Sequence, residues 1–164
     1  MSYADENLLS VHELTHEHEA DVLNFLALRP LHTVAMVSMI RDNGLVSSLN
    51  RGAFYGCRDA MGELEGVALI GHATLIETRT NAGLAAFASI ARECERTHVM
   101  MGECDKLSTF WQHYAEDGEA PRLICREMLF EQRSPVQGFE GVPGLRRATL
   151  DDLDLVAPVQ AQMA

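Results

Sequence analysis

The sequence has 164 residues, 47% of them hydrophobic and 23% charged, which suits one globular domain and argues against extensive disorder. Its formal net charge of −11 argues against a nucleic-acid partner and an anionic membrane surface, because both need clustered Lys and Arg. No apolar run approaches the roughly 20 residues that span a bilayer, so no membrane partner is expected. The polar, acidic start of the sequence is unlike a signal peptide, so the expected location is cytoplasmic.

The first third of the sequence predicts one strand and two helices. The strand is expected over residues 8–11. The first helix begins after Thr15, a plausible N-cap, and ends before Pro30. The second helix begins after Thr33 and ends at Gly44. Apolar side chains recur at helical spacing in both: Val22, Phe25 and Leu26 in the first, and Met36, Val37 and Ile40 in the second.

Strand patterns replace the helical period after the second helix. Turn residues separate three predicted strands, over 53–57, 64–70 and 73–76. The second of them contains Val67-Ala68-Leu69-Ile70, a continuous apolar run that is typical of a strand covered on both faces.

Helices and strands then alternate along the chain. We expect a helix over 84–94, a strand over 99–101, a helix over 107–114 and a last strand within 122–131. The resulting order, β-α-α-β-β-β-α-β-α-β, predicts an α+β fold. Its mixed sheet is mostly antiparallel, and helices flank it.

The C-terminal part predicts a linker followed by an incomplete second unit. Residues 134–144 are rich in Gly and Pro, so residues 1–133 are expected to form one lobe. Residues 145–164 predict a strand over 145–148 and a helix that Thr149 begins. One strand and one helix cannot bury an apolar face by themselves. The order of strand, Thr cap and apolar helix also occurs around Thr15, so we expect the tail to open a second copy of the first lobe.

Histidines and cysteines give no pattern that is typical of a metal site. His12, His16 and His18 lie among glutamates and suit zinc by residue type, but they do not form the H-E-x-x-H arrangement. We therefore favour a solvated helix start and expect no metal. The cysteines form no C-x-x-C pair and are interpreted as structural thiols. They are Cys57, Cys94, Cys104 and Cys125.

The element order over residues 8–132 resembles the GNAT N-acyltransferase fold. The segments Arg41-Asp42-Asn43-Gly44 and 66–74 are similar to the amino-terminal lobe of bacterial tandem GNAT proteins, and residues 145–164 resemble the opening of another lobe. The resemblance implies that the partner of this lobe is a second GNAT lobe of the same polypeptide, or a second copy of the chain.

The resemblance also implies an acetyl-CoA site beside the strand at 73–76. In this family the strand splays from its neighbour, and backbone N–H groups of the following loop hold the pyrophosphate. The family pattern Q/R-x-x-G-x-G/A falls on 79–84, where Arg79 matches, Ala82 replaces the first glycine and Leu84 replaces the second small residue. The residues expected around acetyl-CoA are Ile76, Thr78, Arg79, Asn81, Ala82 and Gly83.

Three residues are candidates for catalysis. In this family a tyrosine on the later helix protonates the CoA thiolate, and Trp111 stands in its place. Indole is no acid at working pH, so Tyr114, one turn away, is the remaining candidate. His72 is a candidate base because imidazole titrates near neutral pH. Glu77 could face the amine from the end of the splayed strand, although we favour a solvent-facing strand end.

Two functions remain open at this point. We favour the N-terminal lobe of an N-acetyltransferase that is non-catalytic or binds CoA only weakly. The alternative is that this lobe itself binds acetyl-CoA and transfers the acetyl group to an amine.

Overall fold

The computed structural model of the chain describes residues 9–134 and 142–163. The chain divides between Leu129 and Phe130 into two compact units. The predicted linker over 134–144 lies largely outside the described residues, so the predicted limits of the two lobes stay predictions. Within the described stretches, no helix has the length and apolar character that crossing a bilayer requires.

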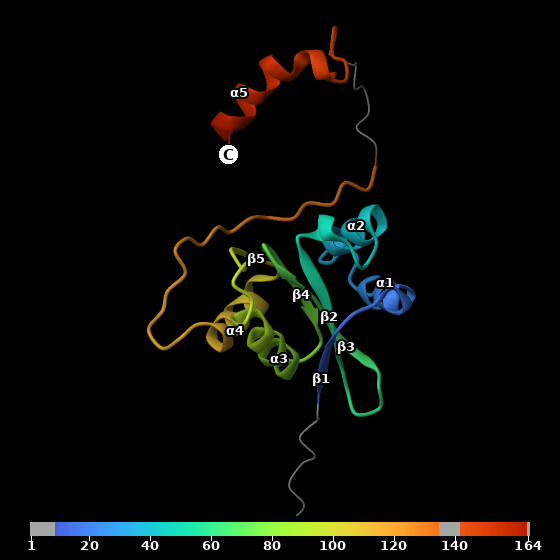
Figure 1. Cartoon of the computed structure of the whole chain (residues 1–164), viewed down its shortest axis with the longest axis vertical. Coiled ribbons are helices and arrows are strands. Elements are labelled where there is room, and N and C mark those ends of the chain that lie inside the picture. Colours follow the sequence, from blue (N-terminus) through green and yellow to red (C-terminus); the bar gives the residue numbers. More distant parts are fainter. Residues whose placement is uncertain (1–8, 135–141, 164) are drawn as a thin grey trace, which may run out of the picture. The chain divides into compact units, whose positions relative to one another are not determined.

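The first half of the first unit supplies three antiparallel strands and two helices (Figure 1). They are β1 (Ser10–Glu13), α1 (Glu19–Leu26), α2 (Val34–Asn43), β2 (Gly52–Arg58) and β3 (Leu64–Gly71). The turn from β2 to β3 is closed by Asp59, whose Oδ1 accepts hydrogen bonds from the backbone N–H groups of Met61 and Glu63, each at 2.9 Å. These elements follow the predicted order. Part of the strand predicted over 8–11 lies outside the described residues.

The second half of this unit completes the sheet. Its elements are β4 (Ala73–Thr78), α3 (Asn81–Arg92), β5 (Val99–Met101) and α4 (Cys104–Tyr114). The strands lie in the order β1-β2-β3-β4-β5, and only β4 and β5 run parallel. A parallel neighbour needs a crossover, and α3 provides it. The structure is therefore α+β, with a five-stranded mixed sheet and helices on both sides, as predicted (Figure 1).

Two apolar layers hold the helices against the sheet. Val67 and Leu69 of β3 join the layer under α1 and α2, whereas Ala68 and Ile70 join the layer under α3 and α4. Successive side chains of a strand point to opposite faces, so this continuous apolar run is buried on both sides. The prediction that β3 is covered on both faces is confirmed.

The strand predicted within 122–131 is not formed. Residues 121–134 contain no strand, and the large apolar side chains of this stretch are 64–79% exposed. They are Leu123, Ile124, Met128, Leu129 and Phe130. An alternating pattern shows that a segment is suited to a sheet, but a strand forms only where a neighbour supplies hydrogen bonds. The segment has no such neighbour in the described chain.

The second unit contains one helix, α5 (Leu153–Met163). The strand predicted over 145–148 is absent, because no other strand of the described chain pairs with it. The start of α5 nevertheless repeats the start of α1. Thr149 has φ −115° and ψ 176°, Thr15 has φ −110° and ψ 171°, and each begins a three-residue 3₁₀ turn that continues as an α-helix.

Candidate functional site

β5 has only three residues and pairs with the first half of β4 alone. Their parallel ladder joins Ala73, Thr74 and Leu75 to 99–101 and ends there. On its other side β4 stays paired to β3 as far as Thr78. The second half of β4 therefore has a sheet neighbour on only one side among the described residues. The splaying that the resemblance implies for the strand at 73–76 is not seen: residues 73–75 pair with the whole of β5, and a Cβ on Gly102, just after β5, would lie 3.8 Å from the Ile76 carbonyl oxygen.

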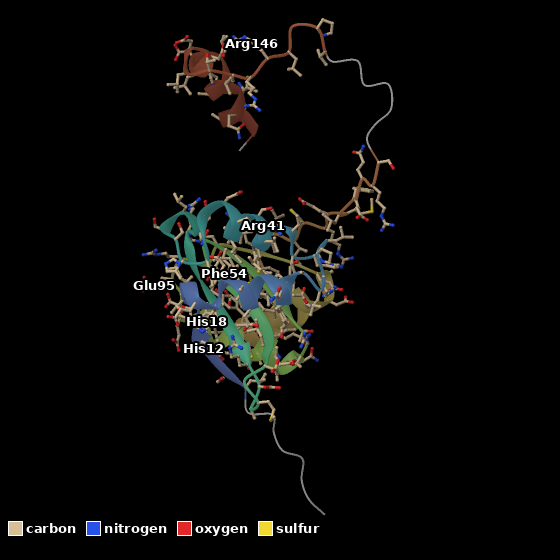
Figure 2. All side chains as sticks on the ribbon, turned by 90° about the vertical axis from the view of Figure 1, so that its right-hand side faces the viewer. His12, His18, Arg41, Phe54, Glu95 and Arg146 are labelled. Atoms are coloured by element: carbon tan, nitrogen blue, oxygen red, sulfur yellow. The ribbon has the colours of Figure 1, made fainter. Side chains whose placement is uncertain are left out.

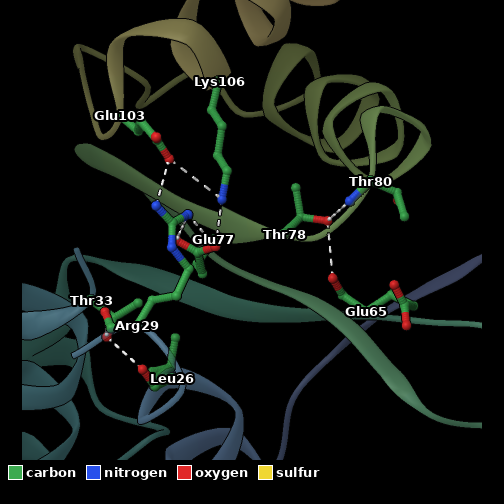
Figure 3. A network of polar contacts seen from close by, with 9 residues as sticks. All are labelled: Leu26, Arg29, Thr33, Glu65, Glu77, Thr78, Thr80, Glu103 and Lys106. Carbon is green, nitrogen blue, oxygen red and sulfur yellow. Dashed lines mark hydrogen bonds and ion pairs between the residues drawn. The ribbon is translucent and has the colours of Figure 1, made fainter. Parts of the chain in front are cut away.

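A cluster of four charged side chains lies beside the second half of β4 (Figure 3). The Glu77 carboxylate accepts hydrogen bonds from Arg29 Nη1, at 3.0 and 3.2 Å, and from Lys106 Nζ. Arg29 Nη2 donates to Glu103 Oε2 at 2.9 Å, and Lys106 Nζ lies 3.8 Å from the same oxygen. The cluster thus links the segment after α1, the strand β4 and the start of α4.

The position of Glu77 explains why the cluster forms. Glu77 lies two residues after Leu75, so it points to the face of the sheet that α1 and α2 cover. Its side chain is only 7% exposed. A buried carboxylate without partners would be strongly destabilising, and the two cations Arg29 and Lys106 compensate it. The expectation that Glu77 is a solvent-facing strand end is therefore wrong.

The cluster is electrically balanced. Two cations, Arg29 and Lys106, face two carboxylates, Glu77 and Glu103. The hydrogen bond from Arg29 holds the pKa of Glu103 below its usual value, and Lys106 adds to this effect. The same bond raises the pKa of Arg29. Both groups are therefore held in their charged forms by their partner.

The loop between β4 and α3 is built around threonine hydroxyls (Figure 3). Thr78 Oγ1 donates to the Glu65 carbonyl at 3.0 Å and accepts from the Thr80 N–H at 3.4 Å. Thr80 Oγ1 in turn accepts from the Gly83 N–H at 3.1 Å and caps α3. A Cβ on Gly83 would lie 2.3 Å from Thr78 Oγ1, so this glycine allows α3 to approach β4.

The remaining residues predicted around acetyl-CoA lie at the same end of β4. Arg79 is 3.4 Å from Glu65 Oε1, and its guanidinium lies 5.1 Å from the centre of the Phe25 ring. Asn81 and Ala82 are exposed in the first turn of α3. The side chains of Ile76 and Thr78 are buried. The six predicted residues are thus neighbours, while the role predicted for them stays a prediction.

The three candidate catalytic residues do not come together. Tyr114 stacks on Phe110, with ring centres 6.0 Å apart, and packs in the layer under α3 and α4, on the opposite face of the sheet from Glu77. His72 precedes β4 and lies five positions before Glu77, which is about 16 Å along an extended strand. Only Glu77 belongs to the charged cluster.

Sequence patterns did not identify the partners of Glu77. Arg29 was interpreted only as the end of a helix, because Pro30 follows it. Lys106 is the one lysine of the sequence, which is the signal that could have drawn attention to it. Arg29 lies 48 positions from Glu77 and 74 positions from Glu103. Local sequence spacing therefore does not reveal these contacts.

The histidines near the N-terminus have a local structural role (Figure 2). His18 Nδ1 lies 3.0 Å from the Thr15 backbone nitrogen and 2.9 Å from Thr15 Oγ1, which closes a capping box. Burial, helped by Arg58 and His18, lowers the pKa of His12. No group of three side chains suited to a metal occurs in 9–134 or 142–163. His18 is accounted for by the helix start that the sequence predicted there.

No family model, curated protein or solved structure matches this chain. What the site can do therefore follows from its own contacts. Those contacts are ion pairs that join β4 to the segment after α1 and to the start of α4. They lie beside the capped start of α3.

Proposed function

We propose that the first unit is a GNAT-like lobe that does not itself transfer an acetyl group, and that it packs as the N-terminal lobe of an N-acetyltransferase. The order of elements supports the relationship, since α3 crosses from β4 to a parallel β5 in an otherwise antiparallel sheet. This element order is the feature on which the sequence resemblance over residues 8–132 rests.

The charged cluster beside the second half of β4 carries the non-catalytic part of the proposal. Glu77 is the one candidate base at this position, and both of its oxygens accept hydrogen bonds from Arg29. Lys106 occupies one of them as well. A general base must come within hydrogen-bond reach of the proton that it removes. An amine would have to displace an ion pair from a side chain that is 7% exposed.

The loop before α3 offers little to the diphosphate of acetyl-CoA. A diphosphate needs free N–H donors and positive charge. The Gly83 N–H is bonded to Thr80, and Arg79 is paired with Glu65. The missing Cβ of Gly83 makes room for Thr78 and not for a ligand. The Gly83 N–H and Arg79 are thus already engaged within the chain, which counts against a diphosphate at this loop.

The repeated helix start supports a second lobe as the partner. The tail repeats part of the N-terminal pattern at a constant offset of 134 positions. Thr149 corresponds to Thr15, Val156 to Val22 and Val159 to Phe25. Val22 and Phe25 are 0% and 8% exposed against the sheet of the first unit, whereas Val156 and Val159 are 47% and 57% exposed. An equivalent sheet, supplied by a second lobe of the same polypeptide or by a second copy, would cover them.

The alternative function is that this lobe binds acetyl-CoA and transfers the acetyl group to an amine. One observation favours it: a carboxylate, Glu77, lies on the strand that the resemblance places beside acetyl-CoA, in the half of β4 that β5 does not pair with. Opening of the cluster would free this carboxylate.

Acetyl-CoA distinguishes the two functions by its effect on thermal stability. A ligand at 100 times its dissociation constant stabilises a protein by about 2.7 kcal/mol. We expect no saturable change of the melting temperature up to millimolar acetyl-CoA, with ATP at equal ionic strength as the control for a non-specific anion effect. A saturable rise with acetyl-CoA alone would favour the alternative.

A further inference from the structure

We propose that a second pocket, at the other end of β4 from the charged cluster, binds a small phosphomonoester. The pocket has a volume of about 320 Å³ and is lined by Ser48, Arg51, His72, Arg96 and His98. Four of these five side chains are basic and the fifth is a hydroxyl donor. Small-molecule sites commonly have volumes from about 300 Å³ upward, so the pocket holds a phosphate with a small organic group.

The charge of the pocket is opposite to that of the protein. The chain as a whole has 24 acidic residues against 13 Lys and Arg, yet no carboxylate lines this pocket. Neither Arg51 nor Arg96 forms an ion pair with any residue in the described part of the chain, unlike Arg29, Arg58 and Arg79. Unpaired guanidinium groups around a hollow are suited to bidentate contacts with phosphate oxygens.

The backbone holds three segments together around the pocket. The His72 N–H donates to the Arg51 carbonyl at 3.0 Å, and the His98 N–H donates to the His72 carbonyl at 3.3 Å. A Cβ on Gly71 would lie 2.4 Å from the Arg51 carbonyl oxygen, so glycine permits this close approach. The rings of His72 and His98 meet edge to face, with centres 5.3 Å apart. These contacts hold together the backbone segments that carry the basic side chains.

Arg51 ends the 3₁₀ turn Ser48–Asn50 in the left-handed conformation, a position that glycine usually occupies. Its φ is +55°, and it is the one residue other than glycine with a positive φ in the described chain. Glycine would adopt this conformation without strain. An exposed arginine at such a position is unfavourable for folding, and strained residues of this kind concentrate at binding sites. The phosphate contact accounts for the side chain at this position.

The test uses the full chain and follows the imidazole resonances of His72 and His98 by NMR. Inorganic phosphate, phenyl phosphate and benzoate are titrated separately at constant ionic strength. We expect saturable shifts with both phosphates, tighter binding of phenyl phosphate, and only weak, linear shifts with benzoate. Saturation by inorganic phosphate alone, or equal responses to benzoate and the phosphates, would overturn the phosphomonoester assignment.

Two variants separate binding from folding. Arg96→Gln is expected to weaken phenyl phosphate binding at least about fivefold, while Arg92→Gln, an exposed arginine outside the pocket, leaves it unchanged. Arg51→Gly relieves the positive φ, so it should raise the melting temperature while weakening binding at least about fivefold. If both Arg51→Gly and Arg96→Gln bind phenyl phosphate as tightly as the unchanged chain, the proposal is wrong.

Discussion

Replacing Glu77 with glutamine leaves Arg29 and Lys106 without their buried carboxylate while keeping the size of the side chain. Breaking a fully buried ion pair costs about 3–5 kcal/mol, and an exposed pair contributes about 0–1 kcal/mol. Glu77 is 7% exposed, but Arg29 and Lys106 are 34% and 22% exposed and keep part of their hydration. We therefore expect a loss of about 2 kcal/mol in the free energy of unfolding, between these limits.

Urea unfolding followed by circular dichroism measures this loss. About 2 kcal/mol corresponds to a fall of the melting temperature by about 8 °C for a domain of this size. Glu95→Gln is the matched control, because Glu95 is exposed and forms no hydrogen bond or ion pair with a described residue. It should change stability by less than about 0.5 kcal/mol.

The comparison of the two variants shows whether the charged cluster stabilises the fold. If Glu77→Gln is as stable as Glu95→Gln, the four charges do not stabilise the packing of β4 against its neighbours. The argument that its ion pairs keep Glu77 from acting as a base then loses its support. A stability gain would mean that the carboxylate is strained where it stands, as reactive groups often are.

Two further predictions concern the packing of α3 and the thiols. Gly83→Ala places a Cβ 2.3 Å from Thr78 Oγ1, so it should destabilise the chain by about 1–3 kcal/mol in urea, and unchanged stability would contradict the close contact. Burial raises the pKa of Cys57 to about 11. At pH 8 a thiol reagent should therefore modify the exposed Cys104 and Cys125 first and Cys57 only on unfolding; equal rates would show that Cys57 is accessible.

Most of the fold could be predicted because each element carries its own periodicity. The apolar run of β3 and the helix starts after Thr15 and Thr33 are local signals, and the order of elements along the chain follows from them. The strand predicted within 122–131 failed for a physical reason. Its alternation is also local, but its existence depends on a neighbour that the described chain does not supply.

The candidate site was less accessible to sequence reasoning. Glu77 could be placed on β4, but its burial depends on Arg29 and Lys106, which are 48 and 29 positions away. Gly83 was interpreted as part of a phosphate loop, whereas its contact with Thr78 shows a packing requirement. The surroundings of Glu77 and Gly83 are formed by side chains of other elements, which local sequence patterns do not place.

The most direct measurement of the central proposal is an amide NMR titration of the ¹⁵N-labelled chain with acetyl-CoA. If the first unit is a packing lobe, the resonances of Asn81, Ala82 and Gly83 at the start of α3 should not move up to millimolar acetyl-CoA. Saturable shifts of these three amides, together with shifts beside Glu77, would contradict the proposal and show that the lobe binds acetyl-CoA.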